Sequence, residues 1–379
     1  MASPRPATPS ATSTLWLRAG QRDVPLLSGP GALGGLGGAL AQVGFAGTLF
    51  VVADSRAADL HGDQLRRLLP NAPLLHISGD EKDKTLGQAA HVWDWLVDRG
   101  AQRRDALVAF GGGVVCDLVG FVAACYLRGI GLVNVPTTLL AQVDASVGGK
   151  TAVNHPRGKN LIGAFYQPLA VVADTSLLAS LPPRAFAGGL AEIAKIAVAM
   201  DADLFAALEG AAAGLSPDNA AALTPFVARA IQLKAGVVER DERESGERLL
   251  LNYGHTVGHA LEAATAYGTL LHGEAVAVGM EAAAHIAQRL GMLAASEAQR
   301  QSAVLRALRL PTTCSAAPVD TVLSRLTADK KRVGARLRWV LPERIGCTRV
   351  RDDVPADVVR GAVERVTRQS DAARLDGAG

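Results

Sequence analysis

The sequence predicts an α/β domain built on a mostly parallel sheet, followed by a mainly helical domain. Over about the first 180 residues, short apolar runs bounded by Gly, Pro or Asp alternate with helical patterns, which is typical of buried parallel strands joined by helices. From about residue 185 onward, strand patterns nearly vanish and alanine-rich periodic segments dominate. The length of 379 residues suits two domains. We place the boundary near Pro182 and Pro183, between domains of residues 15–184 and 185–379.

Four apolar runs carry the prediction of a parallel sheet. They cover residues 48–53, 105–110, 131–135 and 170–173, and each stops at an Asp, Gly or Pro. A weaker run covers residues 74–77, and helical patterns cover 85–99 and 114–127. This alternation of strand and helix favours an α/β layer structure.

The second half shows the 3.6-residue period of helices. We predict helices over residues 186–200, 219–239, 252–266, 273–291, 296–308 and 355–368. Residues 210–218 combine Ala, Gly, Ser, Pro and Asp and predict a loop. Residues 337–341 alternate between apolar and polar before Pro342, so they predict one short strand.

Composition narrows the class of protein. The net charge is only +3, with acids and bases interspersed, whereas a nucleic-acid partner calls for a concentrated basic face. No uninterrupted apolar run reaches the roughly 18 residues that span a bilayer. Four well-separated cysteines favour a reduced, cytoplasmic setting. Residues 1–14 are rich in Ser, Thr, Pro and Ala, and we expect a disordered tail there.

The ends of the predicted strands carry residues suited to a dinucleotide. Asp54 follows the first run, where a carboxylate can accept the hydroxyls of a ribose. Gly111, Gly112 and Gly113 open the next helix, and a helix N-terminus next to bare backbone suits a pyrophosphate. The spacing is not Gly-x-Gly-x-x-Gly, so this is not the usual Rossmann fingerprint. The set of polar residues at successive strand ends predicts a dinucleotide pocket.

Three residues of the second half form a candidate zinc set: Glu192, His255 and His272. One carboxylate and two imidazoles with a fourth position open are typical of catalytic zinc, whereas structural zinc is usually closed by cysteines. The sequence contains no Cys-x-x-Cys and no His-Glu-x-x-His. Glu192 and Lys195 share one helix face, as do His255 and His259.

Cations in otherwise apolar segments predict an anionic substrate. Lys150 and Lys159 are flanked by glycines, and we expect both in turns that an anion can approach. The others are Lys195, Lys234, Arg248 and the pair Lys330 and Lys331. Together with the metal set, they favour a phosphorylated, carboxylated and hydroxyl-rich substrate.

These segments resemble the 3-dehydroquinate synthase family within the sugar phosphate cyclases. The most specific matches are residues 111–117, 136–138, 142–151, 158–163, 191–195 and 251–259, in order, and the resemblance runs from near Asp54 to near Lys331. It implies conversion of 3-deoxy-D-arabino-heptulosonate 7-phosphate to 3-dehydroquinate and phosphate in the shikimate pathway. Catalysis would proceed by transient oxidation, phosphate elimination, re-reduction and an internal aldol closure. NAD and zinc or cobalt would be the cofactors.

The resemblance also implies roles for individual residues. Metal ligands would be Glu192, His255 and His272; NAD contacts would be Asp54, Glu81, Lys84, Gly112, Gly113, Val114, Asp117, Thr137, Thr138, Lys150, Lys159, Leu177, Ser180 and Leu181. Substrate contacts would be Arg128, Asp144, Lys150, Asn160, Lys195, Lys234, Arg248, Asn252, His259 and one or both of Lys330 and Lys331. Lys150, Lys195, Lys234, Asn252 and His259 would be catalytic. Arg128 would reach the phosphate site of a neighbouring subunit, which implies a homodimer.

The sequence departs from the family pattern at two positions. Ala185 follows Arg184 where the family usually has Glu, and Cys116 stands where it often has a small residue such as Gly. Because the metal and phosphate sets are complete, we expect activity to survive.

Three alternatives remain open from the sequence. The nearest is another sugar phosphate cyclase, such as an amino-dehydroquinate, valiolone or inosose synthase. The second is a metal- and NAD-dependent polyol dehydrogenase, which needs no phosphate pocket. The third is an inactive NAD-binding regulator, which the complete metal set disfavours.

Overall fold

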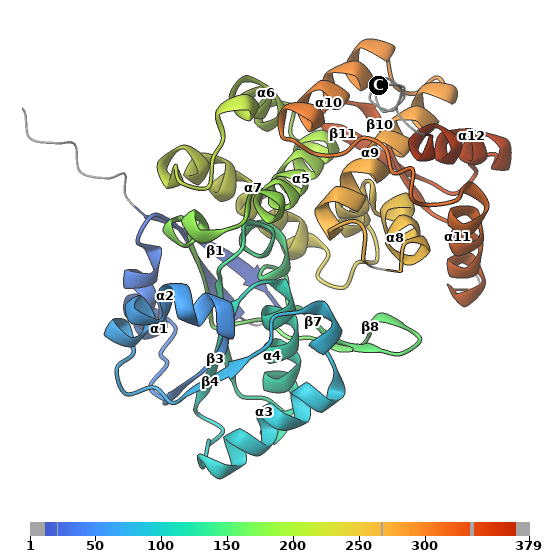
Figure 1. Cartoon of the computed structure of the whole chain (residues 1–379). Coiled ribbons are helices and arrows are strands. Elements are labelled where there is room, and N and C mark those ends of the chain that lie inside the picture. The colour runs from blue at the N-terminus through green and yellow to red at the C-terminus, as the bar shows by residue number, and fades with distance from the viewer. Residues whose placement is uncertain (1–11, 21, 267, 334–336, 369–379) are drawn as a thin grey trace, which may run out of the picture. The chain divides into compact units, whose positions relative to one another are not determined.

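The computed structural model describes residues 12–368 except 21, 267 and 334–336, and it omits the side chains of 328–333. The chain divides into two compact units (Figure 1). The first contains Met1–Pro182 and Ser216–Arg243, and the second contains Pro183–Leu215 and Glu244–Gly379. The division at Pro182 lies close to the expected boundary. Residues 216–243, which we had placed in the helical domain, instead belong to the first unit.

A seven-stranded sheet forms the centre of the first unit, with the strand order β1-β2-β9-β6-β5-β3-β4. Its strands are β1 (Ser13–Ala19), β2 (Arg22–Gly29), β3 (Leu49–Asp54), β4 (Leu74–Ile77), β5 (Ala106–Gly111), β6 (Gly131–Pro136) and β9 (Ala170–Asp174). All neighbours pair in parallel except β1 and β2, which are antiparallel. Ser13 and Thr14 are strand residues, so the expected disordered tail does not reach them, and residues 1–11 of that expected tail lie outside the described part of the chain.

Alternate residues of these strands build two apolar cores, one on each face of the sheet. On β3, Val51 and Ala53 pack into one cluster, and Phe50 and Val52 pack into the other. Burial on both faces explains why these strands appear in the sequence as continuous apolar runs. The helices of this unit are α1 (Leu36–Gln42), α2 (Ser55–Leu68), α3 (Leu86–Asp98), α4 (Gly113–Cys125) and α7 (Ala220–Arg240).

Short helical segments and a hairpin complete the first unit. The segments are η1 (Ala32–Gly35), η2 (Glu81–Asp83), η3 (Tyr126–Arg128), η4 (Ala141–Ala145, a π-helix) and η5 (Thr175–Ser180). Strands β7 (Lys150–His155) and β8 (Gly158–Phe165) form a separate antiparallel hairpin (Figure 1). Lys150 and Lys159 therefore lie in strands, and the expectation that they lie in turns was wrong.

Among the described helices, α7 alone is long and apolar enough to cross a membrane, judged by length and composition. Half of its most apolar window is buried. It packs against β1, β2, η4 and η5, and its Lys234 pairs with Asp144. These are the properties of a core helix.

The second unit is mainly helical. Its helices are α5 (Pro183–Met200), α6 (Ala202–Ala211), α8 (His255–Ala264), α9 (His272–Arg289), α10 (Ala295–Ala307), α11 (Val319–Val333) and α12 (Ala356–Thr367). Short segments are η6 (Ala212–Gly214) and η7 (Glu247–Asn252), so helical structure also enters the expected loop 210–218. The predicted strand near 337–341 appears as β10 (Trp339–Arg344), paired with β11 (Cys347–Arg351).

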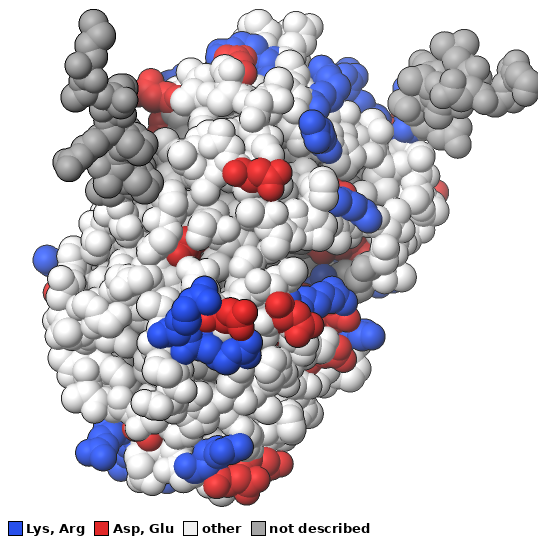
Figure 2. Space-filling view, turned by 60° about the vertical axis from the view of Figure 1, so that its left-hand side comes forward, with Lys and Arg blue, Asp and Glu red and all other residues white. Residues whose placement is uncertain are grey.

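Lysine and arginine side chains lie beside acidic ones over the face shown in Figure 2. Over the described surface, the ion pairs include Arg66 with Asp63 and Arg300 with Glu209. Such exposed pairs contribute about 0–1 kcal/mol each to stability.

Candidate metal and cofactor sites

Close helix packing within the second unit positions the candidate metal ligands. A Cβ added at Gly273 of α9 would lie 2.1 Å from the carbonyl oxygen of Gly188 on α5. A Cβ added at Gly279 of α9 would lie 1.9 Å from the carbonyl oxygen of Gly254, which precedes α8. Side chains at these positions would force the backbones apart, so glycine is what allows the three helices to meet so closely.

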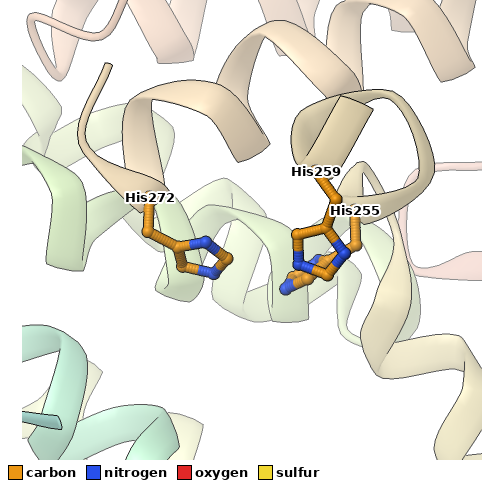
Figure 3. Close-up of side chains that lie close together, drawn as sticks. All are labelled: His255, His259 and His272. Atoms are coloured by element: carbon orange, nitrogen blue, oxygen red, sulfur yellow. The ribbon is translucent and has the colours of Figure 1, made fainter. Parts of the chain in front are cut away.

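Three imidazoles gather where these helices begin (Figure 3). His255 and His259 lie one turn apart on α8, and His272 is the first residue of α9. The ring centroids are 5.1–5.8 Å apart. One ligand atom from each ring lies within 4.8 Å of the others, so the three rings can share one metal ion. Sequence reasoning placed His259 on the same helix face as His255, and the family resemblance assigned it to the substrate; the structure brings its ring close to both others.

Glu192 on α5 lies beside this cluster. Its side chain is fully buried, and Oε1 lies 3.7 Å from Nε2 of His272. The Lys195 ammonium group, itself 1 % exposed, forms an ion pair with the other carboxylate oxygen. Among the described residues, neither carboxylate oxygen of Glu192 has a hydrogen-bond partner. A buried carboxylate is costly unless it is paired or coordinates a metal.

Groups behind two of the rings fix which nitrogen faces the cluster. Oε2 of Glu262, a buried residue on α8, lies 3.2 Å from Nδ1 of His272. The carbonyl oxygen of Tyr253 lies 3.3 Å from Nδ1 of His255. Protonated Nδ1 atoms donate to these oxygens, so each Nε2 is left as an acceptor for a metal. Glu262 was missed from the sequence, although it lies seven residues after His255 on the same helix.

The Tyr253 side chain is itself held firmly. Its hydroxyl group donates to Oε1 of Gln301 at 2.6 Å, and its burial raises the pKa of the phenol. The donor set of Glu192, His255 and His272, with His259 alongside, therefore fits zinc or cobalt: it combines imidazole nitrogens with the oxygens of a buried carboxylate that make no hydrogen bond among the described residues.

In the first unit, the candidate cofactor residues lie where the strand order reverses. Strands β4 and β5 flank β3, and the later strands continue beyond β5. Ligands of such sheets bind at the carboxyl ends of the strands at this point. Asp54 ends β3, and a Cβ at Gly79 would lie 2.2 Å from its Oδ2 atom. A Cβ at Gly111, at the end of β5, would lie 3.1 Å from the Asp54 Cβ.

Helix α4 begins at this edge of the sheet. Gly112 is its N-cap residue, and it offers no side chain to cap the helix. A Cβ at Gly112 or Gly113 would lie 3.2 Å from Thr138 or Ala145, respectively. This narrow stretch of bare backbone at a helix N-terminus suits a pyrophosphate, so the residues fit a dinucleotide.

Asp117 and Lys84 form a buried ion pair one turn into α4. Lys84 is 3 % exposed, and its ammonium group also donates to Oδ1 of Asn160 at 2.6 Å. Burial raises the pKa of the Asp117 carboxyl, and the Lys84 charge opposes that rise. The structure thus joins two predicted NAD contacts to a predicted substrate contact.

The other predicted NAD contacts lie on neighbouring segments. Val114 is in α4, Glu81 begins η2, and Thr137 and Thr138 follow β6. Leu177 and Ser180 lie in η5 and Leu181 follows it, while Lys159 is in β8. Ser180 Oγ lies 2.7 Å from Nε2 of His61. The Leu177 side chain is buried in the core, so a contact there would have to come from its main chain.

Predicted substrate contacts occur in both units. In the first, the buried Lys234 pairs with the Asp144 carboxylate and donates to its carbonyl oxygen at 2.6 Å. Lys150 begins β7, and the exposed Arg128 has a left-handed φ of 67°.

In the second unit, Arg248 is a buried residue of η7. Asn252 donates to Oε1 of Glu244 at 2.6 Å. The side chains of Lys330 and Lys331 lie outside the described part of the chain, so their predicted contacts have no structural description.

Comparisons with known proteins agree with these features. Residues 74–188 match the family model of the 3-dehydroquinate synthase N-terminal domain, and residues 189–332 match that of the C-terminal domain. A 3-dehydroquinate synthase of Pelotomaculum thermopropionicum is 45% identical over 339 residues, covering 88% of this chain and 91% of the relative.

Two solved structures share the fold. One is a 2-epi-5-epi-valiolone synthase from Streptomyces hygroscopicus with NAD+ and Zn2+ bound (TM-score 0.83, 31% identity, 94% of this chain and 99% of that one). The other is a 2-deoxy-scyllo-inosose synthase complexed with carbaglucose-6-phosphate, NAD+ and Co2+ (TM-score 0.82, 29% identity, 93% of this chain and 100% of that one). The fold, the family models and the sequence identity together show that the chain belongs to the 3-dehydroquinate synthase family of enzymes.

Proposed function

We propose that this chain converts 3-deoxy-D-arabino-heptulosonate 7-phosphate to 3-dehydroquinate and phosphate. The structural observation that carries the proposal is the fully buried Glu192 carboxylate, paired with Lys195, beside three converging imidazoles. Family membership supplies the reaction, which is a carbon–oxygen lyase reaction. The expected course is transient oxidation, phosphate elimination, re-reduction and an internal aldol closure.

The proposed metal ligands are Glu192, His255 and His272. Bound zinc or cobalt supplies a Lewis acid that lowers the pKa of a coordinated hydroxyl group. Glu262 and the Tyr253 carbonyl oxygen orient the two imidazoles, as described above. Lys195 stays close to the Glu192 carboxylate, where its positive charge can also stabilise an anionic oxygen of the substrate.

The proposed NAD site is the strand-end region of β3 to β6 together with η2 and η5. Bound NAD supplies a reversible hydride acceptor that is regenerated in each cycle. Asp54, at the end of β3, would accept ribose hydroxyl hydrogens, and the Gly112–Gly113 backbone, at the start of α4, would meet the pyrophosphate. The related valiolone and inosose synthases are described with NAD+ and Zn2+ or Co2+, which supports both cofactors.

The proposed substrate residues match a phosphorylated sugar acid. Lys150, Lys234, Arg248 and one or both of Lys330 and Lys331 would balance phosphate and carboxylate charge. Asp144, Asn160 and Asn252 would orient hydroxyl groups by hydrogen bonds, with His259 and Lys195 nearest the metal set. Cations that are already held by partners, such as Lys234 by Asp144, lose little entropy on binding.

The alternative is another sugar phosphate cyclase activity. Sequence identity favours the dehydroquinate reaction: 45% to the named synthase, against 31% and 29% to the valiolone and inosose synthases. Phosphate release should be compared with 3-deoxy-D-arabino-heptulosonate 7-phosphate, its amino-substituted analogue, sedoheptulose 7-phosphate and glucose 6-phosphate. The proposal requires the first to give the highest kcat/KM, and a higher value for any of the others would replace it.

A cytoplasmic homodimer is the proposed setting. Free, well-separated cysteines fit a reducing compartment. The exposed, left-handed Arg128 matches the family position that reaches a neighbouring subunit. Light scattering on the purified chain should give twice the monomer mass, and Arg128→Ala should raise KM for the substrate without losing NAD affinity.

A further inference from the structure

Asn154 occupies an irregular position in the β7–β8 hairpin. The pairing register shifts between Val153 and His155, so Asn154 lies at a bulge. A bulge takes a residue out of the regular ladder and redirects it. Here the backbone N–H of Asn154 donates to the carbonyl oxygen of Lys84 at 2.7 Å, outside the hairpin.

The Asn154 side chain makes contacts in two directions. Nδ2 donates to Oε1 of Glu81 at 2.7 Å and to the Glu81 carbonyl oxygen at 3.2 Å. Oδ1 accepts from the backbone N–H of Asn160 at 3.0 Å. One amide therefore connects η2 with the turn side of the hairpin, using both its donor and its acceptor.

Asn160 is held from two sides. Its φ is 56°, a left-handed conformation that asparagine adopts more readily than most residues other than glycine. The bond to Asn154 holds its backbone, and the bond from Lys84 holds its side-chain oxygen. The Lys84 ammonium group also pairs with Asp117 at the start of α4. Asn154, Asn160, Lys84 and Glu81 form a closed hydrogen-bonded circuit within the first unit, and Asp117 is attached to it through Lys84.

We propose that Asn154 is a positioning residue that links the NAD-binding segment Glu81–Lys84 to the substrate-binding residue Asn160, so that NAD and substrate strengthen each other's binding. This inference rests on the proposed function, which supplies the roles of Glu81, Lys84 and Asn160. Asn154 itself has no assigned contact with either ligand. It acts by holding both binding segments in one arrangement.

The physical basis is a shared cost of ordering. The exposed residue Asn160 in β8 and the exposed start of the 3-10 segment η2 each lose conformational freedom when they bind a ligand. If Asn154 connects the two segments, binding of the first ligand orders both of them. The second ligand then loses less conformational entropy on binding, and so it binds more tightly. The coupling is reciprocal, because any effect of substrate on NAD affinity equals the effect of NAD on substrate affinity.

Calorimetry on the zinc-loaded chain tests the proposal. NAD affinity is measured alone and with a phosphonate analogue of 3-deoxy-D-arabino-heptulosonate 7-phosphate that cannot eliminate phosphate. We expect the analogue to tighten NAD binding to the wild type. Asn154→Ala should weaken NAD binding about threefold to tenfold, as expected for lost hydrogen bonds, and should remove most of the coupling.

Two further variants sharpen the test. Asn154→Asp keeps an acceptor for Asn160 but sets a carboxylate against Glu81, so it should weaken NAD binding at least as much as Ala does. Leu161→Asn changes an exposed residue of the same hairpin outside the circuit. It should leave the NAD affinity, and the effect of the analogue on that affinity, within twofold of the wild type. Thermal denaturation confirms that each variant is folded.

The outcomes are distinct. Equal NAD affinity and equal coupling in the wild type and a folded Asn154 variant would overturn the inference while leaving the proposed function intact. Failure of the wild type to bind NAD or the analogue would count against the proposed function itself, and the inference would fall with it.

Discussion

Glu262 and His272 form a carboxylate–imidazole pair in which Oε2 of the glutamate lies 3.2 Å from Nδ1 of the ring. The pair turns Nε2 of His272 toward Glu192. Loss of such a partner typically costs 10- to 100-fold in metal affinity.

We therefore predict that Glu262→Gln weakens zinc binding by about tenfold or more, because the amide oxygen can still accept the Nδ1–H hydrogen bond but, being neutral, does not raise the basicity of the ring as a carboxylate does. Competition with a chromophoric chelator measures this affinity. Glu209→Gln, which removes an exposed pairing with Arg300, is the matched control and should bind zinc as the wild type does. Unchanged affinity in Glu262→Gln would show that the pair does not support the metal.

Removal of a ligand should have a larger effect than removal of its support. His272→Ala should lose bound zinc and turnover, yet the chain should remain folded, since the side chain is one-third exposed. Metal content and circular dichroism measure the two properties separately. A variant that keeps full metal and full rate would remove His272 from the ligand set.

The glycine contact between α5 and α9 makes a prediction about stability. Gly273→Ala should lower the free energy of unfolding by about 1–3 kcal/mol, because its Cβ would lie 2.1 Å from the Gly188 carbonyl oxygen. Gly210→Ala in α6 is the control, since nothing lies within 4 Å of an added Cβ. It should stabilise the chain by about 0.5–1 kcal/mol. Urea denaturation compares the two, and equal effects would contradict the packing described above.

Part of the stability should depend on pH through His285. Burial, with the nearby charges of Arg365 and Arg289, lowers the pKa of this imidazole below 6.5. The unfolded chain then binds the proton more readily, so stability should be lost as pH falls from about 6.5 through the lower folded-state pKa.

His285→Gln should reduce the dependence of the free energy of unfolding on pH in this range. Urea denaturation between about pH 7 and pH 5 measures the slope, and His91→Gln at an exposed position of α3 is the control. Parallel curves for the wild type and His285→Gln would rule out this contribution.

Ala185 should not impair catalysis. The adjacent Arg184 binds both carboxylate oxygens of Glu274, at 2.5 and 2.6 Å, and donates to the Thr269 carbonyl oxygen. These bonds hold the segment before His272 without a glutamate at 185. Ala185→Glu should therefore change kcat by less than about threefold, within the effect of one neutral hydrogen bond. A large gain in phosphate release would show that the missing carboxylate matters.

The sequence predicted the sheet better than it predicted the hairpin. Strands such as β3 and β5 are buried on both faces, so their apolar runs are continuous. Strand β8 is largely exposed and begins with Gly158, Lys159 and Asn160, and this start resembles the sequence of a turn. Residues 216–243 belong to the first unit because of tertiary contacts, which no local sequence pattern encodes.

The candidate site shows the same division. Ligand types and helix spacing predicted Glu192, His255 and His272 as one metal set before the family resemblance was considered, and the structure brings their side chains together. Glu262 could have been found, because a residue seven positions after His255 shares its helix face. Asn154 could not, because its role depends on a bulge and on contacts more than 70 residues away in sequence.

The most direct test of the central claim is a count of turnovers per NAD. The zinc-loaded chain is mixed with excess 3-deoxy-D-arabino-heptulosonate 7-phosphate and a trace of NAD, and phosphate and dehydroquinate are both measured. The account predicts equal amounts of the two products, many per NAD, with no net NADH. One NADH per oxidised substrate without phosphate release would contradict it and identify a polyol dehydrogenase instead.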